Sequence, residues 1–425
     1  MAKIFKKRSF ITAAMVLCML IIAVPAMADM LYTAGSSMWM TDRLGLISGT
    51  NAPTKDINTA VSASGGSGVF PFYNESKSAT RVAIAQNSYG ASDTLWVFDP
   101  STGSWSKPVA ELSTVANVHD MTYSEKYLYA AGYDKGIIGS FAISGDTYTT
   151  GKSYTFTPSS SDYKAHAEGV AYYDSNVYGI FTAVKGSYGN YTYLPHKLVK
   201  LSQTLSVVSS ADLNGKNFDG STPGSHVIKG STLYIASLGG NQSTTGSFNT
   251  DSMIEKVDLS TMKSTALVTT ADLVKKDSTW KYNFYSMAIN GETVYIEALY
   301  WGAWGSTTTN NIVIYKTTVS ALEKGDIGTK IGTFTSDGYS VGLDFDSKTN
   351  LLWAATGDTL QKYDGSKWTP YDSTAMGGHL TKFHDLVAAS AKSDSGSSGG
   401  GCNAGFAGLL LLAAIPAITF SRKKK

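Results

Sequence analysis

The sequence predicts an all-β repeat protein, a β-propeller of seven blades, and the same pattern is compatible with six or eight. The 425 residues include 42 Gly and 25 Tyr, and only 16% are charged, a composition typical of short strands and tight turns. Apolar-aromatic segments recur about every 50–60 residues, and no amphipathic helix of useful length interrupts them. Units of this size match four-stranded propeller blades.

Seven segments make up the repeat, and each is followed by a second strand-like segment or a turn. They begin at Leu31, Val82, Leu128, Val177, Leu233, Val294 and Leu352. The unit from Asp344 to Trp368 contains a Leu-Trp strand at Leu352 and a Tyr-Asp-Gly turn at Tyr363. This unit resembles the repeats of bacterial sensor-type propellers. The resemblance implies the fold and carries no function.

The two ends of the repeat are predicted to meet. The segment at Phe383-His384-Asp385 parallels Val118-His119-Asp120, which opens the innermost strand of its blade. The later segment has no blade after it, and the strand at Leu31 has no innermost strand before it. We therefore expect residues 380–389 to complete the first blade and to leave no exposed sheet edge.

The N-terminus has the three parts of a secretory signal peptide. Basic residues from Lys3 to Arg8 precede an apolar run from Phe10 to Val24, and Ala26-Met27-Ala28 places small residues where signal peptidase requires them. We expect residues 1–28 to be removed between Ala28 and Asp29; an uncleaved anchor is the alternative. The mature body, residues 29–390, then has no cysteine, and its stability must come from packing and strand ladders.

The C-terminus is predicted to anchor the chain. Residues 391–401 form a Gly/Ser linker, and residues 402–425 form a tail with an apolar stretch from Ala404 to Phe420 and a basic end. Seventeen residues lie at the lower limit for a transmembrane helix, which needs about 17–25. We expect the terminal cations on the cytoplasmic side.

The order of parts in this tail carries a second resemblance. Gly400-Gly401-Cys402, a short apolar segment and a basic cluster resemble the Synergist-type C-terminal protein-sorting tail, which is similar in layout to the myxobacterial and GlyGly types. The resemblance implies a rhomboid-like intramembrane protease as partner, cleavage near Gly401-Cys402, and lipid attachment at Cys402. A plain C-terminal anchor is the alternative. Either way the chain is expected at the cell envelope or the cell surface.

Charge argues against a nucleic-acid partner. Eight of the 35 cationic residues lie in the two tips, where no acidic residue occurs, so the rest of the chain has 27 cations against 33 acids. A phosphate backbone calls for a basic face, which this body lacks.

Candidate ligand-binding residues gather at the starts of the innermost strands. Long loops between second and third strands, at Lys185–Pro195, Gly239–Asp251 and Trp301–Asn311, should share that face, and such loops usually carry binding. The axial candidates are His119, Asp120, His166, Glu168, His226, Tyr285, Tyr339, His384 and Asp385. Imidazole and carboxylate groups suit a divalent metal cofactor or polar recognition of an anionic ligand. The structural alternative, hydrogen bonding between blades, is favoured because buried polar groups commonly pair.

A second candidate is the aromatic loop with Tyr300, Trp301 and Trp304, which could stack on a sugar or a peptide. The alternative is that the indoles cap a blade core, as large aromatics are mostly buried.

Catalytic motifs are few. The segment Gly338–Gly342 matches a nucleophile elbow but enters a strand rather than a helix. Gly145–Ser153 has one residue too many for a phosphate loop, and Asp344 and Asp346 lack the other ligands of a calcium loop. We therefore expect a noncatalytic binding module that uses the long-loop face. The alternatives are a propeller enzyme, a lyase or hydrolase built on the axial His and acidic residues with or without a metal, and a structural envelope component.

Overall fold

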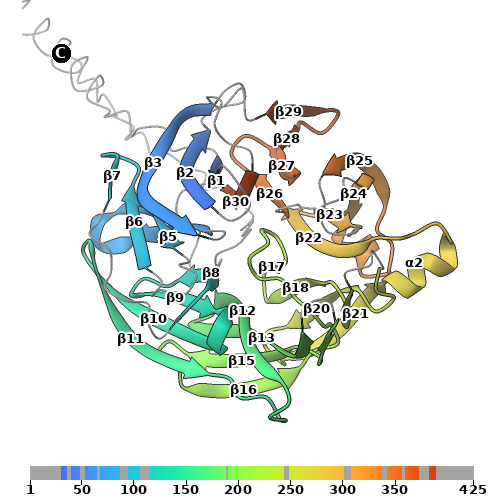
Figure 1. Ribbon diagram of the computed structural model, residues 1–425, viewed down its shortest axis with the longest axis horizontal. Helices are drawn as coiled ribbons and strands as arrows, with labels where there is room; N and C mark the ends of the chain where they lie inside the picture. The colour runs from blue at the N-terminus through green and yellow to red at the C-terminus, as the bar shows by residue number, and fades with distance from the viewer. Residues whose placement is uncertain are drawn as a thin grey trace, which may run out of the picture.

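The computed structural model is shown in Figure 1, and it describes most of the predicted body. The described residues are 30–35, 40–47, 53–64, 68–86, 94–105, 115–187, 190–243, 248–300, 308–336, 342–356, 359–372 and 382–388. The predictions for the signal peptide, the linker and the sorting tail lie outside these ranges, as do Tyr339, Trp301 and Trp304. None of the helices in the described ranges has the length and apolarity that a membrane crossing requires.

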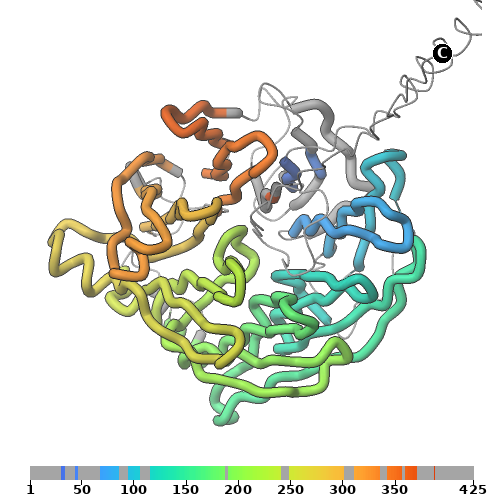
Figure 2. The backbone as a smooth tube through the Cα atoms, turned by 180° about the vertical axis from the view of Figure 1, so that it is seen from behind, coloured from blue at the N-terminus to red at the C-terminus, as the bar shows by residue number. Residues whose placement is uncertain are grey.

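The described strands form seven antiparallel sheets that follow one another around a common centre (Figures 1 and 2). The sheet that joins the two chain ends has the order β3 (Pro53–Ser64), β2 (Met40–Ile47), β1 (Met30–Gly35) and β30 (Lys382–Ala388). The next has β4 (Val69–Asn74), β5 (Ala79–Gln86), β6 (Thr94–Asp99) and β7 (Ser104–Trp105). The third has β8 (Val118–Tyr123), β9 (Tyr127–Gly132), β10 (Ile137–Ser144) and β11 (Thr147–Thr155). The prediction of an all-β propeller is confirmed.

The fourth sheet is the largest, with β12 (Lys164–Tyr173), β13 (Asn176–Ser187), β14 (Asn190–Tyr193), β15 (Lys197–Ser202), β16 (Val207–Asp212) and β19 (Asn241–Ser243). The fifth has β17 (His226–Lys229), β18 (Thr232–Ser237), β20 (Met253–Asp258) and β21 (Lys263–Thr269). The sixth has β22 (Asn283–Asn290), β23 (Thr293–Leu299), β24 (Thr308–Thr318) and β25 (Thr329–Ser336). The seventh has β26 (Gly342–Asp346), β27 (Leu351–Thr356), β28 (Thr359–Tyr363) and β29 (Trp368–Asp372). The helices in the described ranges are short: η1 (Glu75–Lys77), η2 (Tyr133–Lys135), α2 (Thr270–Lys276) and α3 (Val319–Leu322).

The hydrophobic core lies between neighbouring sheets. Between the third and fourth sheets, for example, Ile138 packs with Val170, Phe181 and Val199. Inner strands are covered on both faces, so β22 is buried almost throughout, whereas the outermost strand β16 has no buried residue. This burial pattern explains why the inner strands read as continuous apolar segments in the sequence.

The predicted closure is confirmed. Strand β30 pairs antiparallel with β1, with Met30 opposite Ala388 and Thr33 opposite Asp385. The first and last described strands therefore lie side by side, as Figure 1 shows. The chain ends share one sheet, and the ring closes through the β1–β30 hydrogen bonds and the packing of Val387 with Leu31.

Two of the predicted long loops form additional structure. Strand β13 extends to Ser187 and returns as β14, and β14 pairs with β19 from the loop of the next sheet. Thr192 lies opposite Asn241 in this pairing. The two loops thus build a small antiparallel extension that joins the fourth and fifth sheets.

The rejected motifs have ordinary structural roles where they are described. Gly145 lies in the hairpin between β10 and β11, so this segment is not a phosphate loop. Asp344 and Asp346 belong to β26, and each accepts a hydrogen bond from a backbone N–H just after it.

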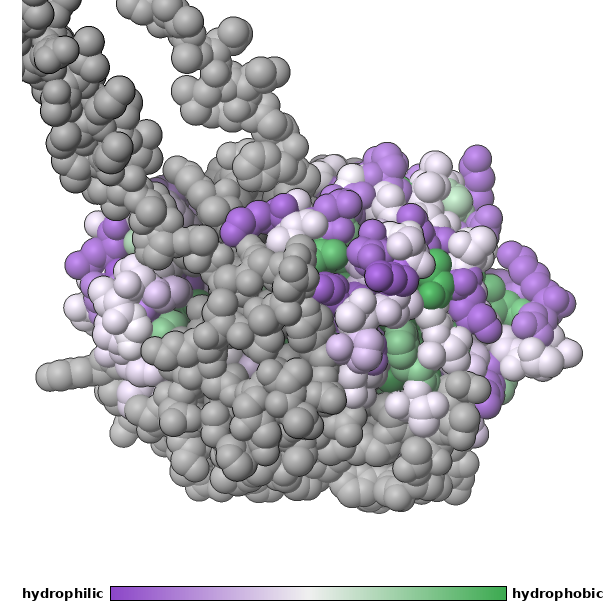
Figure 3. All heavy atoms as spheres, turned by 90° about the horizontal axis from the view of Figure 1, so that it is seen from above, coloured by the Kyte–Doolittle hydropathy of each residue, from purple (hydrophilic) through white to green (hydrophobic). Residues whose placement is uncertain are grey.

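On the side of the molecule in Figure 3, the coloured residues are mostly hydrophilic and the hydrophobic ones are scattered.

Candidate functional site

A β-bulge places His119 and Glu168 at matching positions of neighbouring sheets. In β8, Val118 lies opposite Gly132 and Asp120 opposite Ala131, so His119 is the extra residue of the bulge. The same register shift makes Glu168 the extra residue of β12. It recurs at Tyr285 of β22 and His384 of β30. A bulge re-aims a side chain and is common beside active sites.

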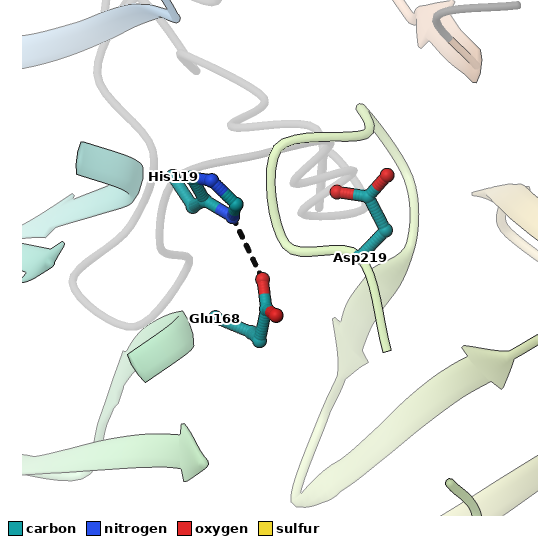
Figure 4. Close-up of side chains that lie close together, drawn as sticks. All are labelled: His119, Glu168 and Asp219. Carbon is teal, nitrogen blue, oxygen red and sulfur yellow. Dashed lines mark hydrogen bonds and ion pairs between the residues drawn. The ribbon is translucent and has the colours of Figure 1, made fainter. Parts of the chain in front are cut away.

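His119 and Glu168 form the centre of a three-residue cluster. His119 Nδ1 lies 2.7 Å from Glu168 Oε2, and both side chains are largely buried. Asp219, from the loop before β17, completes the cluster, and the donor atoms of the three side chains lie within 4.8 Å of one another. Figure 4 shows that the three side chains extend into the same space from β8, β12 and this loop. Sequence reasoning predicted two of these residues and missed Asp219.

Close backbone approaches fix the loop that carries Asp219. A Cβ atom on Gly220 would lie 1.5 Å from the backbone oxygen of Glu168, so only glycine fits there. Further along, the Gly224 carbonyl accepts a hydrogen bond from Met287 N (2.7 Å) in β22. The loop is therefore tied to β12 on one side and to β22 on the other. Its sequence, Asp-Gly-Ser-Thr-Pro-Gly, was the available signal for a tight loop directly before an inner strand.

An aromatic stack supports His119. The Tyr133 ring lies between the rings of His119 (centroids 4.3 Å apart) and His166 (3.9 Å) at small interplanar angles. His166 Nδ1 also lies 2.9 Å from the Tyr133 carbonyl oxygen, and burial lowers the pKa of this histidine. The predicted His166 thus supports the site from behind Tyr133 and is not a member of the cluster.

The charge of the cluster is negative. Burial alone would lower the pKa of His119, but the charge and hydrogen bond of Glu168, and the charge of Asp219, raise it above its usual value. In the described part of the chain, neither carboxylate forms an ion pair with Lys or Arg.

The charges of the cluster also act on two tyrosine hydroxyl groups. Burial, and then the charges of Glu168 and Asp219, raise the pKa of Tyr133 and of Tyr193, which comes from β14 of the loop extension. Both hydroxyl groups therefore stay protonated at neutral pH and can donate hydrogen bonds.

Asp120 and His226 have the structural role that the sequence analysis favoured. The Asp120 carboxylate accepts hydrogen bonds from Met121 N (2.8 Å) and from Val170 N (2.6 Å), so it joins β8 to β12. His226 Nε2 lies 3.4 Å from Asp120 Oδ2. Burial lowers the pKa of His226 to about 4 and raises that of Asp120, so the pair does not act as a full ion pair. Neither residue belongs to the cluster.

Of the remaining predicted residues, Tyr285 does not join the cluster. Tyr285 is buried and packs against Leu343 and Phe345 in the core between the sixth and seventh sheets. The backbone of His384 and Asp385 lies in β30, as expected. Of the aromatic loop only Tyr300 is described, and Lys281 Nζ lies 4.9 Å from the centre of its ring.

No family model matches the sequence, and no curated protein does either. Solved structures share the fold. A putative 6-phosphogluconolactonase from Bacteroides fragilis is 11% identical at a TM-score of 0.54, covering 86% of this chain and 98% of that one. The periplasmic gluconolactonase of Pseudomonas aeruginosa is 10% identical at 0.52, covering 86% and 100%. A protein from Lactobacillus plantarum is 11% identical at 0.51, covering 85% and 98%. At this identity the similarity shows the fold alone.

Proposed function

We propose that this chain is a hydrolase whose axial cluster opens neutral, polyhydroxylated ring esters of the sugar-lactone type. The observation that carries the proposal is the buried His119–Glu168 pair, 2.7 Å apart, with Asp219 beside it at the inner end of the sheets. A buried imidazole whose pKa is raised by neighbouring carboxylates is typical of catalytic sites. This proposal takes the enzyme alternative of the sequence analysis in place of the noncatalytic module.

Ester hydrolysis requires an activated water molecule and a donor to the carbonyl oxygen. The water oxygen bonds to the carbonyl carbon, the ring C–O bond breaks, and the proton released from water goes to the departing alcohol oxygen. The cluster provides nitrogen and carboxylate groups that can take and return this proton. The protonated hydroxyls of Tyr133 and Tyr193 are the candidate donors to the carbonyl oxygen.

The charge of the site favours a neutral substrate. Two carboxylates, Glu168 and Asp219, face the space, and in the described part of the chain no Lys or Arg is paired with either. A phosphate group brought next to these carboxylates would meet like charges in a partly buried site, where repulsion is strong. The names of two of the similar structures support the lactone class, and the electrostatics argue for its unphosphorylated members.

The cellular setting belongs to the proposal as well. A signal peptide ending at Ala28 and a sorting tail starting at Cys402 would place the hydrolase at the envelope, where it would meet extracellular or periplasmic lactones. N-terminal sequencing of the mature protein tests the first of these cuts, with Asp29 expected as the first residue.

The test is lactone hydrolysis followed by acid release in a pH-stat, with a neutral sugar δ-lactone and its 6-phosphorylated counterpart. We expect turnover above the spontaneous rate with the neutral lactone, and a loss of about 10²–10⁴-fold in kcat/KM in His119→Gln and Glu168→Gln. Asp258→Asn is the matched control for Asp219→Asn, because Asp258 and Asp219 each accept from the N and Oγ of the serine two residues later. Hydrolysis no faster than the spontaneous reaction would refute the proposal. Full activity in both His119→Gln and Glu168→Gln would refute it as well.

A further inference from the structure

We propose that His119, Glu168 and Asp219 together bind one divalent transition-metal cation of the Mn²⁺ or Zn²⁺ class. The binding itself rests on the cluster geometry, and only its catalytic consequence rests on the proposed function. Each of the three side chains offers one donor atom, and the donors come from three separate parts of the chain that the ring brings together.

The donor set points to a particular class of cation. An imidazole nitrogen with two carboxylate oxygens is a mixed set that suits first-row divalent metals, whereas Ca²⁺ and Mg²⁺ prefer oxygen donors alone. Two bonds of about 2.1 Å at tetrahedral or octahedral angles place their donor atoms about 3.0–3.4 Å apart. The donor atoms of the cluster lie within 4.8 Å of one another, and His119 Nδ1 and Glu168 Oε2 lie 2.7 Å apart, so small side-chain movements in both directions would fit the three donors to one ion.

The supporting contacts leave the donors available. Thr182 Oγ1 lies 3.4 Å from Glu168 Oε1, so the opposite oxygen, Oε2, is the one that faces His119. Ser221 donates from its N and Oγ to Asp219 Oδ1, and within the described residues Oδ2 has no hydrogen-bond partner. Such contacts orient ligating carboxylates and are a usual part of metal sites. A cation would take the place of the proton between His119 Nδ1 and Glu168 Oε2, and that proton would leave to solvent.

Three other aspartates in the described part of the chain form the same turn as Asp219 but belong to no such cluster. Asp99, Asp258 and Asp364 each accept from the serine two residues later, as Asp219 does. In the described part of the chain, only Asp219 among them joins a His and a second acid to form a three-residue cluster. The turn is therefore a repeated structural device, and the cluster is a feature added to one copy of it.

An organic ammonium ion is the competing occupant, and the aromatic geometry argues against it. Aromatic cages bind such ions against open ring faces. The faces of Tyr133 are covered by His119 on one side and His166 on the other, so this residue presents its edge and hydroxyl group. Tyr133 therefore offers this space no open ring face.

With a cation bound, the proposed hydrolysis gains a second way to activate water. A divalent ion lowers the pKa of bound water and polarises an adjacent carbonyl oxygen. In that case the hydroxyl groups of Tyr133 and Tyr193 would remain the candidate donors to the substrate carbonyl. The cation would also offset the charges of Glu168 and Asp219, so the preference for a neutral lactone is a prediction for the metal-free protein.

The binding test uses the full-length purified protein after chelator treatment, titrated separately with MnCl₂, ZnCl₂ and CaCl₂ by isothermal calorimetry, with no lactone present. We expect one saturable site for wild type and Asp258→Asn, and at least tenfold weaker binding for Asp219→Asn and Glu168→Gln. Matching circular dichroism and thermal midpoints of the two Asp variants separate loss of binding from loss of fold. A second check is the Mn²⁺ electron paramagnetic resonance signal, which should broaden on binding to wild type and remain that of the free ion with Glu168→Gln.

Three results would overturn the inference: no saturation by either ion up to 1 mM, equal affinity in Asp219→Asn and wild type, or preference for Ca²⁺ over both ions, which would leave His119 without a role. Failure of the proposed function looks different, because it appears as absent lactone turnover in protein whose Mn²⁺ site titrates normally. Lactone turnover that survives complete removal of metal would uphold the hydrolase and leave the cation without a catalytic part.

Discussion

Removing the buried imidazole of His196 should make the fold more resistant to acid. His196 is fully buried between the fourth and fifth sheets, and neither ring nitrogen has a hydrogen-bond partner among the described residues. Its ring packs edge-on against Phe218, with centroids 5.9 Å apart. Burial lowers the pKa of His196 to about 3, against 6.5 for the exposed group. The native state therefore holds a neutral imidazole that the unfolded chain would protonate in weak acid.

The size of the effect follows from this pKa difference. Because the folded pKa lies below the unfolded one, the free energy of unfolding falls as pH drops below 6.5 and continues to fall until about pH 3. Each pH unit in that window costs about 1.4 kcal/mol. Between pH 7 and pH 4.5 the loss from His196 alone is about 3 kcal/mol. His226, with a pKa near 4, adds a loss of the same sign and similar size.

The perturbation is His196→Leu, and the measurement is urea unfolding followed by tryptophan fluorescence at pH 7 and at pH 4.5. The leucine keeps an apolar contact with Phe218, and the backbone hydrogen bonds of residue 196 to Gly215 and Leu213 do not involve the side chain. We expect the variant to lose about 3 kcal/mol less than wild type between the two pH values. His226 is unchanged in both proteins, so its contribution cancels.

Equal acid sensitivity of wild type and His196→Leu would refute the reasoning, since it would mean that the imidazole is solvated or paired in solution. A wild-type stability that rises toward pH 4.5 would refute the sign.

Two further predictions concern the loop and the ring. Gly220→Ala should displace Asp219 from Glu168, because the new Cβ meets a backbone oxygen that no rotamer change can move; we expect a loss of at least about 100-fold in lactone turnover. Gly291→Ala is the control: it meets no neighbouring atom but has a φ of +55°, so it tests whether backbone strain away from the cluster alone lowers activity, and similar activity of the two variants would contradict the clash. Ending the chain at residue 381 instead of 390 removes β30 and exposes the edge of β1. Thermal unfolding should then shift to lower temperature, and an unchanged midpoint would contradict the role of the closing strand.

Much of the fold could be predicted because each sheet repeats the same burial pattern. Inner strands are covered on both faces and so appear as apolar runs at near-equal spacing, with short turns such as Asp174-Ser175 between them. The closing strand could be predicted because Phe383-His384-Asp385 repeats Val118-His119-Asp120. In the structure both histidines are the extra residue of a bulge.

The site was only partly predictable because a bulge changes which residue reaches the axis. In β12 the extra residue of the bulge is Glu168. Strand β17 pairs with β18 without a register shift, so no bulge re-aims a side chain there. His226 is buried against Asp120, although its place in the sequence resembles that of the other histidines.

Asp219 could not be predicted from the repeat, since it lies in a loop between two sheets and not in one of the repeated strands. Its position depends on Gly220 lying against the backbone of Glu168, a contact between residues about 50 positions apart. No local pattern encodes such a contact. The Tyr133 stack is similar: it joins His119 to His166 through a short helix that the sequence reading did not single out.

The most direct measurement of the central claim is the kcat/KM of the chelator-treated, metal-free wild-type protein for a neutral sugar δ-lactone against that for the same lactone carrying a 6-phosphate. The negative cluster of His119, Glu168 and Asp219 predicts preference for the neutral lactone by at least about tenfold, equal to about 1.4 kcal/mol of like-charge repulsion. Preference for the phosphorylated lactone would mean that the lactone is hydrolysed at another place on the propeller, away from the cluster, and would contradict the account.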